Sequence, residues 1–186
     1  MSLLTLDEVA CWRGGRLLFE GLNLSLSAGE AMLVTGPNGR GKSSLLRLAA
    51  GLLKPIAGRV SAAPCALADE RPALDPELTL ERALAFWAAA GCNVPDAISA
   101  TGLEALSQVP VRLLSSGQLR RASLARVSLS GAALWLLDEP ANGLDTNSLD
   151  LLGALLSTHL ARGGAILAAS HQPLPGAQWL SLELAP

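Results

Sequence analysis

The sequence predicts an α/β fold: a largely parallel sheet, β structure before it, and a helical insertion in its middle. Three observations support this prediction. Short apolar runs at 31–35, 133–137 and 165–169 are typical of strands buried on both faces of a parallel sheet. Helical patterns follow the first two runs, and apolar and polar residues alternate before them, at 22–27. Strands that alternate with helices in this way indicate one α/β layer structure.

Composition limits the class of protein. The chain has 186 residues, of which 50% are hydrophobic and 16% are charged, whereas a typical soluble domain is about 25% charged. This composition excludes a disordered chain. Three separated cysteines without a C-x-x-C pair indicate thiols in a reducing compartment. The net charge of −2 provides no basic surface for nucleic acid. The length suits a single domain, residues 1–186.

The apolar excess raises the question of a membrane span. The longest run without charge, residues 163–182, is nominally long enough to cross a bilayer. His171, Gln172 and two prolines interrupt it, and the hydrogen-bonding groups of this segment could not all be paired in a single helix surrounded by lipid. The N-terminus has no basic region before an apolar core, so no signal peptide is expected. We therefore expect a soluble chain, part of whose surface is covered by a partner.

The first half of the chain is expected to begin with a hairpin. Residues 22–27 alternate leucine with asparagine or serine, residues 3–6 are a plausible partner strand, and Gly14-Gly15 is the turn between them. The buried strand 31–35 follows, and then a glycine-rich loop leads into a helix carrying leucines from 45 to 53. Gly51 and Pro55 help to end that helix.

The second half continues the alternation. Residues 74–130 are mostly helical in pattern, with loops expected at 93–96 and 109–110. Strand 133–137 precedes a helix that is capped by Asp145 or Thr146 and closed by Gly163-Gly164. Strand 165–169 ends at Ser170-His171, and residues 179–184 are expected to form one more strand.

The glycine-rich loop has the Walker A spacing G-x4-G-K-S between a buried strand and a helix. Its glycines let successive N–H groups face phosphate oxygens, and the helix N-terminus attracts anions. Lys42 is predicted to reach the β- and γ-phosphates of ATP, and the Ser43 hydroxyl to bind Mg²⁺. A glycine-rich turn alone is a modest signal, and its strand–loop–helix context makes it specific. The predicted phosphate-binding residues are Gly36, Pro37, Asn38, Gly39, Arg40, Gly41, Lys42, Ser43 and Ser44.

An acidic pair follows the second buried strand, in a Walker B pattern. The apolar residues 134–137 fix the strand, so that Asp138 stands at its carboxyl end, near the Walker A loop. There Asp138 is predicted to hold Mg²⁺ through water, and Glu139 to orient the attacking water as general base. An acidic pair at a strand end is by default only solvated, but the upstream Walker A loop favours the catalytic interpretation.

The segment Leu114-Ser115-Ser116-Gly117-Gln118 resembles the L-S-G-G-Q signature of the ABC ATPases, with Ser116 in place of the first glycine. The resemblance implies an ABC-type nucleotide-binding domain of the P-loop NTPase class. Such a domain has an N-terminal antiparallel β subdomain and an inserted helical subdomain, here at about 74–130. It also implies that Ser115, Ser116, Gly117 and Gln118 form a second phosphate cradle. That cradle faces the Walker A loop of the other subunit in a homodimer that binds ATP and Mg²⁺.

Two further segments fit the same family. Residues 142–145, Asn-Gly-Leu-Asp, resemble the D-loop, which passes between subunits. His171, after the third buried strand, resembles the switch histidine that contacts the γ-phosphate, so the expected catalytic residues are Lys42, Glu139 and His171. His159 lies in the middle of a helix and is interpreted as structural or solvent-facing.

Two positions of the family pattern are weak in this sequence. The adenine-stacking aromatic residue is expected near the first hairpin, where Trp12 is close but Arg13 is the alternative. The Q-loop glutamine is expected shortly before Leu78, and the segment contains none. Glu70 or Arg71 would occupy its place.

Within the ABC family the chain most resembles the CcmA subfamily, the ATP-binding subunits of cytochrome c maturation systems. The resemblance is carried by the short length and by segments 13–22, 76–81 and 170–174, the last reading S-H-Q-P-L. It implies a peripheral motor on the cytoplasmic face of the bacterial inner membrane. Its membrane partners would be CcmB, with CcmC and CcmD, and its ATP hydrolysis would drive haem export or release of the haem chaperone.

The segment around Ala83, Phe86, Trp87 and Ala90 is the expected docking groove for a membrane subunit, and core packing of an amphipathic helix is the alternative. Other functions stay open at the level of sequence. These are an ABC transporter for another substrate, a soluble ABC ATPase acting on DNA or ribosomes, and a small P-loop kinase. The missing basic face argues against the second, and the signature motif argues against the third.

Overall fold

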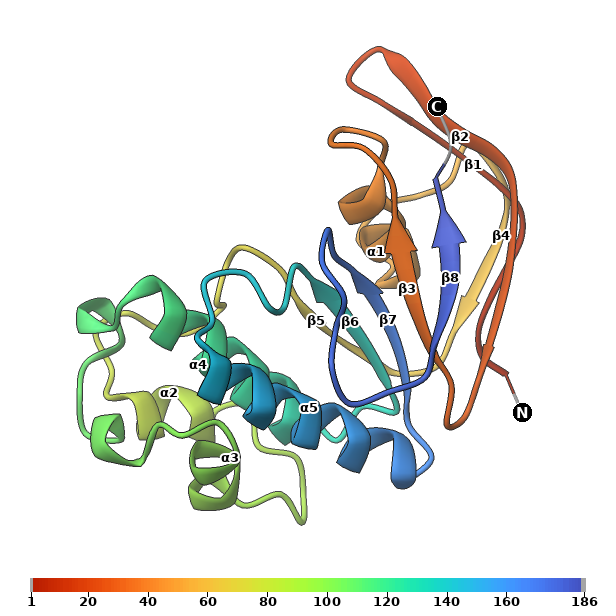
Figure 1. Cartoon of the computed structure of the whole chain (residues 1–186). Helices are drawn as coiled ribbons and strands as arrows, with labels where there is room; N and C mark the ends of the chain where they lie inside the picture. The colour runs from red at the N-terminus through yellow and green to blue at the C-terminus, as the bar shows by residue number, and fades with distance from the viewer. Residues whose placement is uncertain (1, 185–186) are drawn as a thin grey trace.

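The computed structural model of the chain describes residues 2–184, which form two sheets with helices packed around them (Figure 1). The strands are β1 (Ser2–Arg13), β2 (Arg16–Ser27), β3 (Ala31–Thr35), β4 (Ala57–Ala62), β5 (Cys65–Ala68), β6 (Leu134–Asp138), β7 (Ala165–Ala169) and β8 (Trp179–Glu183). The helices are α1 (Lys42–Ala49), α2 (Leu80–Ala85), α3 (Val94–Ala100), α4 (Ser116–Leu129) and α5 (Thr146–Ala161), with single turns η1 (Glu104–Leu106) and η2 (Val111–Leu113).

The N-terminal sheet is antiparallel, in the order β2-β1-β4. The hairpin prediction is confirmed, because β1 and β2 pair with Leu4 opposite Leu26 and Leu6 opposite Leu24, across the turn at Gly14-Gly15. These leucines are buried and the residues between them face outward, as the alternation predicts. Strand β4 was not predicted, because its sequence A-G-R-V-S-A has no clear alternation.

The second sheet is parallel throughout, in the order β5-β6-β7-β3-β8. The predicted strands β3, β6, β7 and β8 are confirmed to within one or two residues, and β5 is an addition to them. All five strands end at the same edge of the sheet. The segments after β3, β5, β6 and β7, which carry the Walker A loop, Glu70, Asp138-Glu139 and His171, therefore meet at one place.

Helix α1 lies between the two sheets, while α4 and α5 cover the other face of the parallel sheet (Figure 1). Buried side chains of α1, β6 and β7 share one apolar cluster with those of β1 and β2. Residues of β6, β7, α4 and α5 form a second cluster. A third cluster joins α2, α3 and α4 within the predicted helical region 74–130. Helix α4 thus contacts both the parallel sheet and the helical region.

Two helix boundaries differ from the prediction, and a third decides between two predicted caps. Helix α1 ends at Ala49, and Leu52 beyond it is 69% exposed. The expected loop at 93–96 is the start of α3, with Asn93 as N-cap and Pro95 in the first turn, where a missing N–H costs nothing. Asp145, not Thr146, is the N-cap of α5, since its carboxylate accepts a hydrogen bond of 2.8 Å from the Ser148 N–H.

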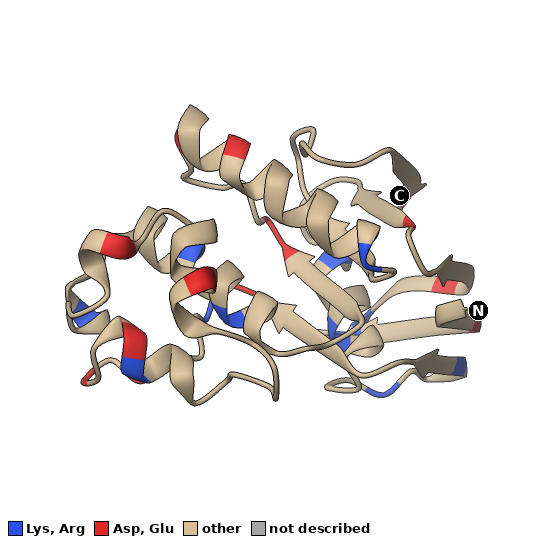
Figure 2. Cartoon of the chain, turned by 90° about the horizontal axis from the view of Figure 1, so that it is seen from below, with Lys and Arg blue, Asp and Glu red and all other residues tan. Residues whose placement is uncertain are grey.

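Charged residues are sparse and of mixed sign along the described chain (Figure 2). Between residues 2 and 184, none of the helices has the length and apolarity that crossing a bilayer requires.

Candidate nucleotide-binding site

The Walker A loop connects β3 to α1 through backbone that only glycine adopts easily. Gly36 has a φ of 131° and Gly41, the N-cap of α1, a φ of 102°. A Cβ on Gly36 would stand 2.7 Å from the Leu184 carbonyl oxygen, and one on Gly41 about 3.1 Å from the Leu18 side chain. Because Gly41 has no side chain, no cap covers the first N–H groups of α1, which stay available to an anion.

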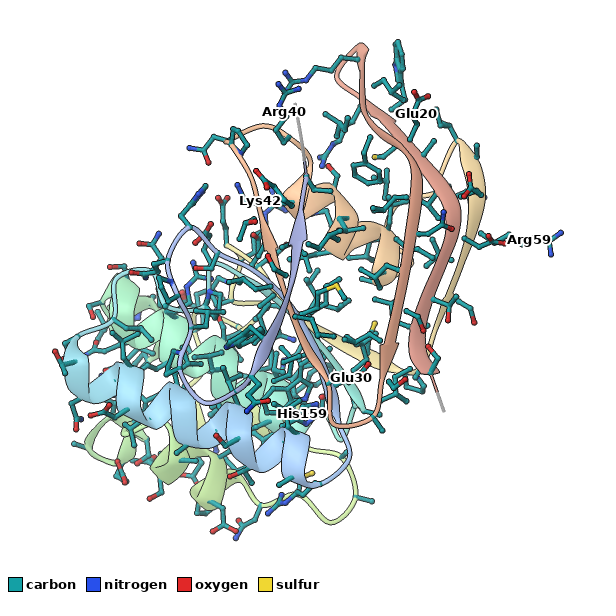
Figure 3. The ribbon with its side chains drawn as sticks, turned by 45° about the vertical axis from the view of Figure 1, so that its right-hand side comes forward. Glu20, Glu30, Arg40, Lys42, Arg59 and His159 are labelled. Atoms are coloured by element: carbon teal, nitrogen blue, oxygen red, sulfur yellow. The ribbon has the colours of Figure 1, made fainter. Side chains whose placement is uncertain are left out.

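Lys42, the first residue of α1, turns its ammonium back into the loop (Figure 3). Its Nζ donates hydrogen bonds to the carbonyl oxygens of Gly36 at 2.8 Å and Pro37 at 3.3 Å, and lies 3.4 Å from His171 Nε2. The side chain is only 7% exposed. The loop therefore concentrates one cation at the N-terminus of a helix, which is the arrangement that a polyphosphate requires.

The acidic pair lies at the carboxyl end of β6, beside this loop. Asp138 is buried, which raises the pKa of its carboxyl, while a hydrogen bond with Ser43 opposes that shift. Glu139 has a φ of 49°, a strained value for a residue with a side chain, and its N–H bonds to the Ala169 carbonyl oxygen at 2.8 Å. The two adjacent carboxylates have different partners: Asp138 bonds with Ser43, whereas Glu139 contacts His171.

His171 contacts Glu139 at two points. Its Nε2 lies 3.2 Å from Glu139 Oε1, and its backbone N–H donates to Oε2 at 3.3 Å. With the Lys42 contact, the imidazole thus joins the three residues that were predicted to be catalytic. Ser170 stabilises the turn that contains His171, because the Ser170 hydroxyl donates a hydrogen bond to the Gln172 carbonyl oxygen at 2.9 Å.

These residues surround one open cavity of about 720 Å³, at the carboxyl edge of the parallel sheet. Of the predicted phosphate-binding loop, Asn38, Gly39, Gly41, Lys42, Ser43 and Ser44 line it, whereas Gly36, Pro37 and Arg40 do not. Asp138, Glu139, Asn142 and His171 line its other side. Gly36 and Pro37 act on it indirectly, through the Lys42 hydrogen bonds.

At each weak position, one of the two candidate residues lines the cavity and the other does not. Arg13 lines the cavity and its guanidinium lies 3.4 Å from the Ser44 hydroxyl, whereas Trp12 lies outside it and is 52% exposed. Glu70 lines the cavity and Arg71 does not. Arg120, which the sequence did not single out, also lines the cavity.

The signature residues 115–118 are not part of this cavity. They lie at the N-terminus of α4, where the Gln118 N–H bonds to the Ser115 hydroxyl at 3.3 Å and the Ser115 N–H bonds to Gln118 Oε1 at 2.8 Å. Ser115 is therefore a helix cap within the single chain. A Cβ on Gly117 would stand 3.0 Å from the Gly143 carbonyl oxygen, so the signature lies against the predicted D-loop.

The expected docking segment divides into buried and exposed parts. Ala83 is 2% exposed and belongs to the helical core, whereas Phe86 is 81% exposed. Trp87 lies half-buried beneath the Arg126 guanidinium, with 4.9 Å between the two groups. A cavity of about 250 Å³ opens beside Phe86 and Trp87. Ala90 lies beyond the end of α2 and does not line that cavity.

The site's donors suit a nucleotide and a magnesium ion. Amide and ammonium donors meet at the α1 N-terminus, and the Ser43 hydroxyl and the Asp138 carboxylate supply the oxygen ligands that Mg²⁺ prefers. Within residues 2–184, no group of three acidic, histidine or cysteine side chains is placed to hold a metal unaided.

The family model of ABC transporters matches residues 19–142. The chain belongs to the ABC transporter family. As an ABC ATPase it is 56% identical, over 91% of its length and 90% of the relative's, to the cytochrome c biogenesis ATP-binding export protein CcmA of Sphingopyxis alaskensis. It is 50% identical to the CcmA protein of Zymomonas mobilis, over 97% of this chain and 84% of that protein.

Solved structures agree with this assignment. An ATP-binding subunit of an ABC transporter superimposes on this ABC ATPase with a TM-score of 0.83, at 25% identity, covering 91% of the chain and 79% of that subunit. A dimeric ATP-binding cassette, captured after hydrolysis with ADP and Pi, has the same fold, with a TM-score of 0.77 at 22% identity. The superposition covers 91% of this chain and 88% of that cassette.

Proposed function

We propose that this ABC ATPase is the motor subunit of a cytochrome c maturation complex, in which ATP hydrolysis drives haem export or release of the haem chaperone. The observation that carries the proposal is the 56% identity to a CcmA protein over nine-tenths of both chains. The nucleotide site supports the ATP-dependent part independently, because it unites a phosphate-binding loop with a buried carboxylate and a candidate base.

In the proposed site each residue has a distinct role. The α1 amides and Lys42 bind the phosphates, which compete with the loop carbonyls for the Lys42 ammonium. Ser43 and Asp138 would hold Mg²⁺, and a cation there would favour the ionised form of the buried Asp138. Glu139 accepts the proton of the attacking water, and His171 holds that carboxylate in position. Mg²⁺ supplies charge neutralisation on the phosphates.

For the adenine base, the lining of the cavity supports Arg13, the sequence-based alternative to Trp12. Arg13 stands at the cavity and Trp12 outside it. We propose that the Arg13 guanidinium stacks on adenine, because a planar cation packs well against an aromatic face.

We further propose that the active form is a homodimer in which Ser115, Ser116, Gly117 and Gln118 of each subunit face the Walker A loop of the other. Support comes from the location of the signature on α4, outside its own cavity and against the D-loop. A helix N-terminus that is displayed at the surface suits a phosphate presented by a second chain.

The proposed membrane partners are CcmB-like subunits, with CcmC and CcmD, at the cytoplasmic face of the bacterial inner membrane. The exposed Phe86 beside the 250 Å³ cavity is the proposed contact with them. The support is that Phe86, at 81% exposure, borders a cavity that Leu78, Ala83 and Trp87 also line.

A genetic replacement tests the whole proposal. The gene is deleted in its own bacterium, and haem-stained cytochrome c is measured after return of the wild type, Lys42→Ala or Glu139→Gln. We expect restoration by the wild type alone. In the alternative function, an ABC transporter for another substrate, cytochrome c would be normal in the deletion strain.

Purification of the same chain separates these outcomes further. Glu139→Gln is expected to bind ATP and accumulate a dimer, because binding survives the loss of the base. Normal hydrolysis by this variant would assign the base to another residue. Co-purification with a six-helix membrane protein supports the motor, whereas co-purification with ribosomes or DNA would contradict it.

A further inference from the structure

Arg120 connects the signature helix to the catalytic edge of the sheet. It lies in α4, two residues after Gln118, and its side chain lines the nucleotide cavity. Its Nη1 donates to two main-chain carbonyl oxygens, those of Asp138 at 3.1 Å and Asp69 at 3.2 Å. One guanidinium nitrogen of helix α4 is therefore hydrogen-bonded to the chain at the carboxyl ends of two neighbouring strands, β6 and β5.

Both carbonyls precede a functionally placed side chain. The Asp138 carbonyl belongs to the peptide that enters Glu139, whose backbone has the strained φ of 49°. The Asp69 carbonyl belongs to the peptide that enters Glu70, which lines the cavity. The Asp69 carboxylate is held separately, by Arg47 of α1 at 3.5 Å and by the Arg71 N–H at 3.0 Å. Arg120 thus acts on the peptide units that orient Glu139 and Glu70.

A guanidinium suits this position. It stays charged at any working pH, its donors are fixed in one plane, and hydrogen bonds from a charged donor are stronger than neutral ones. A strained backbone persists only where its surroundings hold it. The Arg120 hydrogen bond supplies such a restraint at the residue before Glu139.

We propose that Arg120 is a positioning residue for ATP hydrolysis. It holds the Asp138–Glu139 peptide in its productive orientation and carries movements of the signature helix to the Glu139 carboxylate. The inference rests on the proposed function, since it takes Glu139 as the base. It adds a connection through which engagement of the signature with nucleotide on a second copy would reach the base in the same chain.

The neighbouring Arg121 provides a matched control. It is the next residue of the same helix, and its Nη1 also donates to two main-chain carbonyls, those of Thr101 and Gly102 at 2.9 and 2.6 Å. Those acceptors lie after α3, in the helical region, and Arg121 does not line the nucleotide cavity. The two arginines make similar bonds and differ in what they hold.

The test compares Arg120→Gln, Arg120→Lys and Arg121→Gln in steady-state ATP hydrolysis, fluorescent ATP-analogue binding and thermal melting. For Arg120→Gln we expect kcat to fall about tenfold, with KM and nucleotide affinity within about twofold of wild type. Arg120→Lys keeps the positive charge but lacks the planar guanidinium fork, so its kcat should lie between those of wild type and Arg120→Gln. Arg121→Gln should lower Tm at least as much as Arg120→Gln and keep kcat within about twofold.

A double variant tests the route of action. If Arg120 acts through Glu139, adding Arg120→Gln to Glu139→Gln should leave the residual hydrolysis rate unchanged, because the carboxylate to be positioned is gone. The proposal would be overturned if the two substitutions lowered the hydrolysis rate independently, so that their effects multiplied in the double variant. It would also be overturned by a wild-type kcat in Arg120→Gln, or by a loss of kcat in Arg121→Gln equal to that in Arg120→Gln. If Arg120→Gln does not fold, Arg120→Lys decides, since wild-type kcat in that variant contradicts the required fork.

Failure of the proposed function gives a different result. If the chain is the ATPase of a transporter for another substrate, cytochrome c is normal in the deletion strain while the kcat effect of Arg120→Gln persists. If the chain does not hydrolyse ATP, wild-type protein and Lys42→Ala show the same ATP turnover.

Discussion

Helices α1 and α4 both begin at a short segment of serine and glycine, yet their N-termini are built differently. At α1 the N-cap is Gly41, without a side chain, and the cavity opens at the first turn. At α4 the hydroxyl of Ser115 and the amide of Gln118 cap each other's backbone N–H groups, and the end lies outside the cavity. The free amides of α1 suit a phosphate held within one chain. The capped end of α4 keeps its shape alone and suits a phosphate brought by another chain.

The strongest test of the α1 half of this comparison removes its cation. Lys42→Ala should abolish ATP turnover, because the α1 N-terminus then lacks the charge that holds the β- and γ-phosphates. The measurement is phosphate release at saturating ATP. Lys54→Ala, at the chain's other lysine, is the control and should hydrolyse ATP normally. Wild-type turnover in Lys42→Ala would refute the Walker A assignment.

The α4 half of the comparison is tested by blocking its surface. Ser115→Arg should inactivate a homodimer, since a long cation obstructs the end that faces the partner's nucleotide. A mixed dimer with Ser115→Arg in one subunit and Lys42→Ala in the other should keep one intact composite site. Turnover by that mixed dimer, measured after tandem-affinity purification, is therefore expected to exceed that of either homodimer. No turnover in it would indicate that both sites are needed together.

A smaller effect distinguishes the cap from the contact. Ser115→Ala should lower the free energy of unfolding by about 1 kcal/mol, the usual cost of losing a serine N-cap. Urea denaturation measures it, with Ser116→Ala as the neighbouring control, expected within about 0.5 kcal/mol of wild type. Equal losses of unfolding free energy at both positions would show that the reciprocal cap adds no stability of its own.

The smallest effect concerns a third helix end, that of α5, which carries a charged cap. The hydrogen bond from Ser148 lowers the pKa of Asp145 from its ordinary value of 3.8. Stability from this ionised cap is therefore full above the unfolded pKa and is lost as pH falls through the lower folded pKa. Asp145→Asn should flatten the acid side of the stability curve slightly, as measured by Tm against pH. An unchanged slope would contradict the role of the charge.

The parallel strands β3, β6 and β7 were predictable because burial in the middle of the sheet leaves an unbroken apolar run, as at Leu134–Leu137. Strand β4 was not, since its small residues carry no period. Motif spacing alone predicted that Lys42, Asp138 and His171 share one site, and all three line the cavity. The contacts of Arg120 were not predicted, because its acceptors are main-chain carbonyls 18 and 51 residues away in the sequence, which no local pattern encodes. The sequence did not show which of Trp12 and Arg13 lines the cavity, because that depends on the direction in which the hairpin turns its side chains.

The arrangement of the two lysines has a practical consequence for labelling. Lys42 opens α1 and is almost enclosed, whereas Lys54 follows the end of that helix and faces solvent. With twelve arginines and only these two lysines, an amine-reactive dye meets one accessible side chain apart from the terminal amine. Lys54 is therefore the one exposed lysine available for attachment, and tethering or fluorescent tagging at its side chain leaves the enclosed Lys42 ammonium unmodified.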